Sequence, residues 1–272
     1  MENRLSSLFK SEKNALLSVY YTAGYPLITD TLPVAKALQN SGADILEIGI
    51  PFSDPIADGP TIQASNDVAL SNGMNLNLLF EQIAELRKEV NIPVLLMGYF
   101  NPIFQFGVEK FCQHCQVAGI DGLIIPDMPL WEYETKWKQV LEKFGLFNVF
   151  LVTPQTPESR IKTIDGLSTS FIYMVSSSSV TGTKNSISAD QIGYFNRIQN
   201  MKLQNPTLIG FGISNHESFK NASNFSRGAI IGSAFIEVLK KLDSTKSDDR
   251  YSPITKFVES VKGLNQPKNY AE

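Results

Sequence analysis

The chain alternates eight short apolar segments with helical patterns, and this order of elements predicts a (β/α)8 TIM barrel. The apolar segments are nearly continuous, which is typical of parallel strands that are covered on both faces. No stretch of the 272 residues resembles a linker between domains, so we expect a single barrel domain over residues 1–272. An open doubly wound sheet is the alternative, but it would contain fewer strands.

The eight predicted strands recur at intervals that leave room for helices between them. They are Leu16–Ala23, Asp44–Ile50, Pro93–Tyr99, Gly122–Pro126, Asn148–Val152, Phe171–Val175, Thr207–Phe211 and Ala229–Gly232. Between most of them lie segments whose apolar residues have helical spacing. These are Thr31–Ser41, Asn77–Val90, Val108–Ala118, Leu130–Phe144, Pro157–Leu167, Ala189–Asn200, the shorter His216–Asn221 and, after the last strand, Pro253–Val261.

The two ends of the chain lie outside this alternation. Residues 2–13 are predicted to form an additional N-terminal helix, because Leu5, Leu8 and Phe9 fall on one side of it. Residues 266–272 follow the last helical pattern and are predicted to form a disordered tail.

Composition excludes several classes of protein. The formal net charge is −3, the isoelectric point is about 5.6, and no run of lysines and arginines is interleaved with aromatic residues, so we expect no nucleic-acid partner. The first residues lack the apolar centre of a signal peptide, and no segment is long and apolar enough to span a membrane. We therefore expect a cytoplasmic protein that has no membrane partner.

The two cysteines, Cys112 and Cys115, flank His114 within a predicted helix. Such a group is either half of a zinc or redox site or a pair of small buried residues. A structural zinc needs four ligands, and the chain offers only one further histidine, His216. Burial in the helix is the favoured interpretation, so no metal site is expected.

One buried carboxylate stands out in the segment Ala43–Gln63. Glu47 interrupts an apolar strand near its C-terminal end, where the functional residues of barrels lie. Burial raises the pKa of a carboxyl group toward the range in which it exchanges protons at neutral pH. Asp54 and Asp58 follow in the adjoining loop, although aspartates before Pro55 and Gly59 are also ordinary turn residues. The cluster indicates two carboxylates with separate catalytic functions.

Glycine-bearing turns follow the last three predicted strands. They are Val180–Thr183, Gly210–Ser214 and Gly232–Ala234. Loops after strands seven and eight of barrels often bind phosphate through backbone N–H groups, so these turns predict a phosphate site. The serine-rich residues 176–188 are either a floppy surface loop or a lid that closes over the ligand.

Four motifs together resemble one known family. LEIGIPFSDPIADGPTIQ at residues 46–63, VTG at 180–182, GFGIS at 210–214 and IIGSAF at 230–235 look like the α subunit of tryptophan synthase, and the resemblance covers about residues 4–264. It implies a barrel enzyme, a lyase of tryptophan biosynthesis. That enzyme cleaves indole-3-glycerol phosphate by a retro-aldol reaction, giving indole and glyceraldehyde 3-phosphate.

The resemblance also implies roles for individual residues. Glu47 matches the proton shuttle, and Asp58 matches the carboxylate at the indole N–H. Asp54 matches no catalytic residue, and we expect a structural role for it. The residues that match substrate-binding positions are Tyr99 and Phe211 beside the indole, Tyr173 near Glu47, Thr181 in the lid, and Gly182, Gly212, Gly232 and Ser233 at the phosphate.

By the same resemblance, the partner is the tryptophan synthase β subunit in an α2β2 heterotetramer. Pyridoxal phosphate is expected only in that β subunit, and no cofactor is expected in this chain. The loops Pro51–Gly59 and Pro126–Trp131 are expected to face the partner. Ser177 and Ser179 stand where many relatives have arginine and glycine, so the lid of this chain departs from the family pattern.

Two other functions are compatible with a phosphate-binding barrel. A sugar-phosphate isomerase or aldolase is one, but a Schiff-base aldolase needs a lysine inside the barrel, and the predicted strands carry no clear inward lysine. A non-catalytic barrel that only binds and activates a partner is the other. The presence of both Glu47 and Asp58 favours an enzyme.

Overall fold

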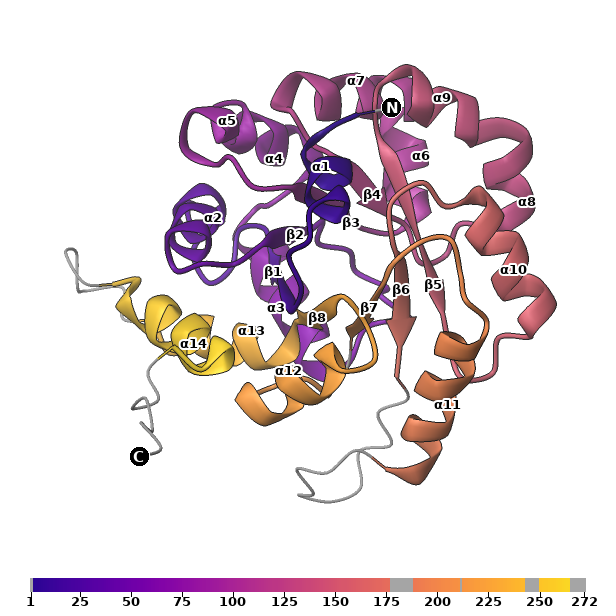
Figure 1. Cartoon of the computed structure of the whole chain (residues 1–272). Coiled ribbons are helices and arrows are strands. Elements are labelled where there is room, and N and C mark those ends of the chain that lie inside the picture. The colour runs from indigo at the N-terminus through magenta and orange to yellow at the C-terminus, as the bar shows by residue number, and fades with distance from the viewer. Residues whose placement is uncertain (1, 177–187, 211, 243–249, 265–272) are drawn as a thin grey trace, which may run out of the picture.

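A computed structural model describes residues 2–176, 188–210, 212–242 and 250–264. Within these residues, eight parallel strands form a closed barrel in which each strand pairs with the next and the last pairs with the first (Figure 1). The strands are β1 (Leu16–Thr22), β2 (Ile45–Gly49), β3 (Val94–Met97), β4 (Gly122–Ile124), β5 (Phe147–Val152), β6 (Ile172–Val175), β7 (Thr207–Gly210) and β8 (Gly228–Ile231). The predicted fold class is confirmed, and every predicted strand is present.

Helices surround the barrel and connect its strands. They are α1 (Arg4–Lys10), α2 (Thr31–Asn40), α3 (Pro60–Ser71), α4 (Leu76–Ile83), α5 (Leu86–Glu89), α6 (Phe100–Phe106), α7 (Val108–Ala118), α8 (Leu130–Glu132), the π-helical η1 (Tyr133–Trp137), α9 (Lys138–Lys143), α10 (Glu158–Leu167), α11 (Ala189–Asn200), α12 (His216–Ser223), α13 (Ser233–Leu239) and α14 (Ser252–Lys262). The predicted tail, 266–272, lies outside the described residues.

Several helices differ from the prediction. The segment Asn77–Val90 was predicted as one helix but divides into α4 and α5. The Arg87 guanidinium of α5 donates to the carbonyls of Gly119, Val90 and Ile92. The segment predicted from residue 130 to 144 is helical but contains the π turn η1. Helices α3, α6 and α13 were not predicted. Helices α3 and α13 begin directly at turns that glycine and proline had marked, and α6 begins directly after the predicted strand Pro93–Tyr99.

The apolar residues form two cores, one inside the barrel and one between the strands and the helices. Strand residues alternate between them. In β2, Ile45 belongs to the interior core, whereas Leu46 and Ile48 pack toward the helices. This alternation places Glu47, two residues after Ile45, inside the barrel.

The N-terminal helix α1 closes the amino-terminal end of the barrel. Asn3 caps α1 and also donates to the carbonyls of Asp121 and Gly145. Leu5 is fully buried in the interior core, and the Phe9 ring lies 5.3 Å from the Phe171 ring, centroid to centroid. The predicted additional helix is thus present, and its apolar side faces the barrel interior.

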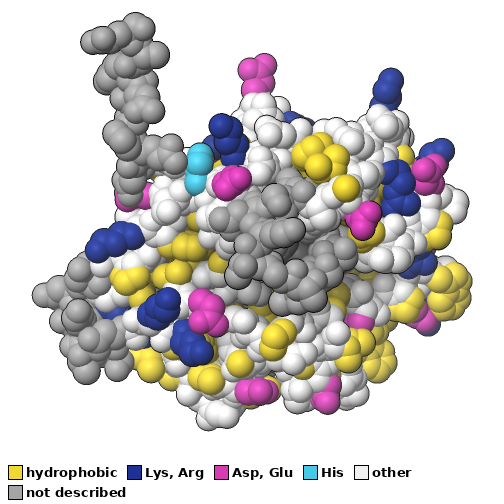
Figure 2. Space-filling model, turned by 90° about the horizontal axis from the view of Figure 1, so that it is seen from below, with side chains coloured by type: hydrophobic (Ala, Val, Ile, Leu, Met, Phe, Trp, Pro, Cys, Tyr) yellow, Lys and Arg dark blue, Asp and Glu magenta, His cyan; other side chains and the backbone are white. Residues whose placement is uncertain are grey.

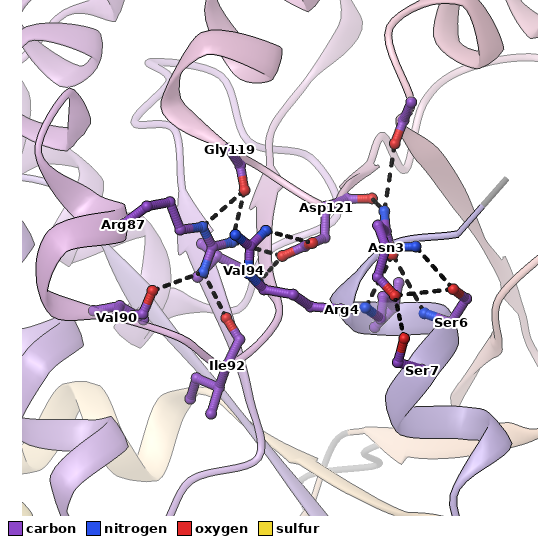
Figure 3. A network of polar contacts seen from close by, with 12 residues as sticks. Asn3, Arg4, Ser6, Ser7, Arg87, Val90, Ile92, Val94, Gly119 and Asp121 are labelled. Atoms are coloured by element: carbon purple, nitrogen blue, oxygen red, sulfur yellow. Dashed lines mark hydrogen bonds and ion pairs between the residues drawn. The ribbon is translucent and has the colours of Figure 1, made fainter.

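Ion pairs hold the same end of the barrel together. The Asp121 carboxylate, 1% exposed, pairs with Arg87 at 2.6 Å and Arg4 at 3.3 Å and also accepts the Val94 N–H (Figure 3). A second buried carboxylate, Asp44, pairs with two lysines and accepts a backbone N–H from β1. Asp121 directly precedes β4, and Asp44 directly precedes β2.

No helix among the described residues is long and apolar enough to cross a membrane.

Candidate active site

The carboxyl ends of the strands carry the predicted site. The arrow of β6 points downward in Figure 1, so Figure 2, which is seen from below, shows this face of the molecule. Two of the predicted carboxylates belong to it: Glu47 from β2, and Asp58 from the loop that joins β2 to α3. The chain therefore places both acids where barrel enzymes carry their chemistry.

Glu47 is completely buried inside the barrel. Its Oε1 accepts a hydrogen bond of 2.6 Å from the Ser18 hydroxyl of β1, and its Oε2 has no partner among the described residues. Burial raises the pKa of Glu47 to about 7, although the Ser18 hydrogen bond opposes that shift. A carboxyl group with this pKa is present in both protonation states at neutral pH, and it can therefore donate and accept a proton.

Asp58 ends the loop that follows β2. Gln63 of α3 holds this loop by donating to the backbone carbonyls of Asp58 at 2.9 Å and Pro55 at 3.3 Å. Burial raises the pKa of the Asp58 carboxyl to about 6, and hydrogen bonds from Tyr99 and Asn66 oppose the rise. Since its pKa lies below that of Glu47, Asp58 is the more strongly ionised of the two at pH 7.

Two buried tyrosines stand beside these acids. Tyr20 of β1 and Tyr173 of β6 both face Glu47 and Asp58, which raise the pKa of each phenol further above the level set by burial. Each ring lies over a glycine of the adjacent strand. A Cβ at Gly49 would come within 2.2 Å of the Tyr20 hydroxyl oxygen, and one at Gly210 within 2.3 Å of that of Tyr173. Only glycine leaves room for these two rings.

Tyr99 connects the end of β3 to the loop that carries Asp58. Its hydroxyl accepts a 2.8 Å hydrogen bond from the Ala57 N–H, and its ring lies 5.4 Å from the Phe52 ring, centroid to centroid. Burial, followed by the nearby Asp58 charge, raises the pKa of Tyr99 to about 12. The phenol therefore stays protonated and available as a hydrogen-bond donor.

The predicted phosphate residues are described in part. Gly212 follows β7 with φ of +76°, a conformation that favours glycine, and a Cβ there would meet none of the described atoms within 4 Å. Gly232 caps α13, and Ser233 is the first residue of that helix. Open backbone of this kind permits close approach by a ligand. Thr181, Gly182 and Phe211 lie outside the described residues, as do 177–187 of the predicted lid.

Three residues near the two acids were not predicted from the sequence as polar partners. Ser18 and Asn66 hydrogen-bond to them, and the charges of both acids act on the Tyr20 phenol. Ser18 interrupts an apolar strand as Glu47 does, and that interruption was the available signal. Asn66 is 1% exposed in α3, and its Oδ1 has no partner among the described residues. Neither position identifies its partner until the barrel closes.

The remaining candidates do not join the site. Asp54 is exposed and accepts a hydrogen bond from the neighbouring Ser53 hydroxyl. Cys112 and Cys115 are fully buried in α7, and burial raises the pKa of both thiols. In the described parts of the chain, no three histidine, cysteine, aspartate or glutamate side chains lie together as metal ligands would.

Comparison with known proteins gives consistent matches over most of the chain. A family model described as tryptophan synthase alpha chain matches residues 5–266. The tryptophan synthase alpha chain of Flavobacterium psychrophilum is 51% identical, over 95% of this chain and 99% of that one. The corresponding protein of Christiangramia forsetii is 49% identical, over 96% and 99% of the two chains.

Solved structures agree with these matches. Tryptophan synthase subunit alpha from Legionella pneumophila has a TM-score of 0.85 and 29% identity, over 97% of this chain and 98% of that one. A chain of the tryptophan synthase complex from Pyrococcus furiosus has a TM-score of 0.81 and 33% identity, over 92% and 99% of the two chains. The fold, the site geometry and these matches lead to one conclusion: the chain belongs to the tryptophan synthase alpha chain family.

Proposed function

We propose that this chain cleaves indole-3-glycerol phosphate to indole and glyceraldehyde 3-phosphate. The observation that carries the proposal is the state of Glu47: a completely buried carboxyl group at the mouth of the barrel, with a pKa of about 7 and one oxygen that has no partner among the described residues. Cleavage of this substrate requires a group that gives a proton to carbon and takes one from a hydroxyl. A carboxyl group present in both forms at neutral pH meets that requirement.

In the proposed reaction, protonated Glu47 transfers its proton to C3 of the indole ring, and the ring nitrogen becomes positively charged. The resulting carboxylate then removes the proton from the hydroxyl on the adjacent side-chain carbon. As that oxygen forms the aldehyde, the bond between C3 and the side chain breaks, and its electron pair neutralises the ring. The products are indole and glyceraldehyde 3-phosphate, and Glu47 ends the cycle protonated.

Asp58 is assigned to the indole N–H. Positive charge develops on that nitrogen when C3 is protonated, so a neighbouring carboxylate stabilises the transition state more than the bound substrate. Tyr99 supports this role, because its hydroxyl bonds Ala57 and lies beside the Asp58 carboxylate. Tyr99 and Phe211 are assigned to the walls of the indole pocket, and Tyr173 to the region around Glu47.

The phosphate is assigned to the turns after the last strands. Among the described residues, the position beside the Gly212 backbone is open, and Gly232 caps α13, which begins at Ser233. Gly182 is assigned to the same site, and Thr181 is assigned to a lid that meets Asp58 upon closure. Backbone N–H groups at such turns bind phosphate oxygens without any positively charged side chain.

The proposed partner is the β subunit of tryptophan synthase in a cytoplasmic α2β2 assembly, with pyridoxal phosphate bound only by the β subunit. Three large apolar side chains in the segments that follow β2, β3 and β4 support a protein interface. Ile56 after β2 is 86% exposed, Phe104 in α6 after β3 is 56% exposed, and Trp131 in α8 after β4 is 61% exposed. Exposed apolar side chains of this size are typical of binding surfaces.

The test is release of indole from indole-3-glycerol phosphate by the purified chain, with and without a β subunit. We expect cleavage that is measurable alone and faster in the complex. A chain that releases no indole under either condition is not this enzyme. Cleavage of sugar phosphates that lack the indole ring would assign the barrel to a different reaction.

A further inference from the structure

The Ser18 hydroxyl is the sole side-chain partner of Glu47 among the described residues. Ser18 lies inside the barrel on β1, in register with Ile45 of β2 on one side and Ile230 of β8 on the other. Both Ser18 and Glu47 have no exposed surface, and the Ser18 Oγ lies 2.6 Å from Glu47 Oε1. Ser18 is therefore a polar residue whose strand neighbours are aliphatic, and its hydroxyl donates to one atom, Glu47 Oε1.

We propose that Ser18 is a positioning residue for the reaction: its hydroxyl holds Glu47 Oε1 and leaves Oε2 as the oxygen that exchanges the proton with substrate. The inference rests on the proposed function of Glu47. The terminal torsion of a glutamate side chain is soft, so an unbound carboxyl group inside the barrel would rotate freely between its two oxygens. One hydrogen bond from Ser18 prevents this exchange of the two oxygens, and it adds no charge beside Glu47.

The chemistry of a hydroxyl suits this task better than a cation would. A serine hydroxyl donates to a carboxylate, and it also donates, more weakly, to the carbonyl oxygen of the protonated acid. The bond to Oε1 therefore persists when Oε2 gains or loses its proton. An arginine or lysine at the same position would hold Glu47 in its ionised form and prevent it from acting as an acid.

The groups that face Glu47 do not replace Ser18. Tyr20 of β1 and Tyr173 of β6 are buried phenols whose pKa values are raised, so they stay neutral. Asp58, from the loop after β2, also faces these phenols and is acidic. No described lysine or arginine forms an ion pair with Glu47. The Ser18 hydrogen bond opposes the effect of burial on the pKa of Glu47, so its removal moves that pKa upward.

The experiment compares Ser18→Ala and Ser18→Thr with the unchanged chain in the cleavage of indole-3-glycerol phosphate, over a range of pH. Ser18→Ala should lower kcat roughly tenfold or more near neutral pH, because a hydrogen bond to a charged group is lost. Its KM should change by no more than about twofold, because Ser18 does not touch the substrate. The limb of the kcat–pH profile that reports ionisation of Glu47 should move to higher pH. Ser18→Thr, which keeps the hydroxyl, should restore the profile.

A matched control is Ser170→Ala, which removes a buried hydroxyl just before β6, at the opposite end of the barrel from the site. It should change neither kcat nor the profile. An unmoved profile with normal kcat in Ser18→Ala would overturn the positioning role. So would equal losses in Ser18→Ala and Ser170→Ala, since these would indicate a general effect of losing a buried hydroxyl.

A second measurement separates this inference from the proposed function. The carboxyl stretching band of Glu47, identified by its absence in Glu47→Gln, can be titrated by infrared spectroscopy without any substrate. Ser18→Ala should shift that titration to higher pH even if the chain released no indole. If the unchanged chain did not cleave indole-3-glycerol phosphate, only the proposed function would be wrong. If the titration of the Glu47 band did not shift in Ser18→Ala, the positioning role of Ser18 would be wrong.

Discussion

The two ends of the barrel hold carboxylates in opposite surroundings. At the amino-terminal end, Asp44 and Asp121 are each 1% exposed, and each lies between two positively charged side chains. At the carboxyl-terminal end, Glu47 is bonded by one neutral hydroxyl, and Asp58 by a phenol and an amide. Among the described residues, neither of these two acids forms an ion pair.

The carboxylates that form ion pairs contribute to stability, and those without ion pairs are the ones suited to catalysis. Paired carboxylates at one end connect segments that are distant in sequence, such as Asp44 with Lys262 of α14. Unpaired carboxylates at the other end have pKa values raised toward neutrality, to about 7 for Glu47 and about 6 for Asp58, and so they can exchange protons or respond to developing charge. Removal of a carboxylate should therefore have different consequences at the two ends.

The largest effect is expected from Glu47→Gln. The amide has nearly the shape of the acid but cannot exchange a proton, so kcat for indole release should fall by roughly 10²–10⁴-fold. The unfolding temperature should not fall, because no ion pair is lost. Rates and thermal unfolding of the variant, measured side by side, check both statements, and turnover near normal would remove Glu47 from the mechanism.

The second effect belongs to the other end. Asp121→Asn leaves Arg87, whose side chain is 17% exposed, without its charged partner, and the free energy of unfolding should fall by about 3–5 kcal/mol. The kcat of the folded fraction should be unchanged. Denaturant unfolding measures the loss. Lys10→Met, which removes the exposed pair with Glu2, is the control and should unfold like the unchanged chain. A large fall in kcat in Asp121→Asn would break the division between the ends.

The third effect is a dependence of stability on pH. The pKa of Glu47 is higher in the folded chain, about 7, than its ordinary value of 4.5, so the folded chain binds more protons between these values. Stability contributed by this group is therefore present at low pH and lost as pH rises toward 7, by roughly 3 kcal/mol in total.

Glu47→Gln removes that dependence. Compared with the unchanged chain, the variant should gain stability between pH 4.5 and pH 8, and denaturant unfolding at the two pH values measures the gain. Parallel stability curves for Glu47→Gln and the unchanged chain would contradict the raised pKa.

The smallest effect is expected from Asp58→Asn. The amide keeps an acceptor oxygen but loses the charge that opposes the developing cation, so kcat should fall by about 10²-fold. KM should change little, because the charge matters mainly in the transition state. Steady-state kinetics distinguish the two parameters. A rise in KM at constant kcat would reassign Asp58 to substrate capture.

Much of the fold was predictable from local patterns. Helices α7 and α11 have the predicted bounds, because their apolar spacing is clear and glycine or a capping serine marks one end of each. The break between α4 and α5 was not predictable, because it coincides with hydrogen bonds from Arg87 to a carbonyl 32 residues away. Helix α6 was missed because it is only seven residues long and contains Pro102 and four aromatic or aliphatic residues.

The site was predictable in its acids but not in their partners. Glu47 interrupts an apolar strand, and that local signal is strong. Ser18 and Asn66 became partners only through the strand register between β1 and β2 and the packing of α3 over the barrel. A pattern along one segment contains no information about which atom of a neighbouring segment it will face.

Helix α1 has a consequence for the order in which the chain is made. Its cap residue, Asn3, bonds carbonyls 118 and 142 residues further along, and Phe9 packs against Phe171. At a synthesis rate of roughly 5–20 residues per second, Asn3 is made roughly 7–28 s before its hydrogen-bond acceptor Gly145. During that interval the apolar side of α1 has no barrel to cover it. Helix α1 is therefore made well before the segments that cover its apolar side.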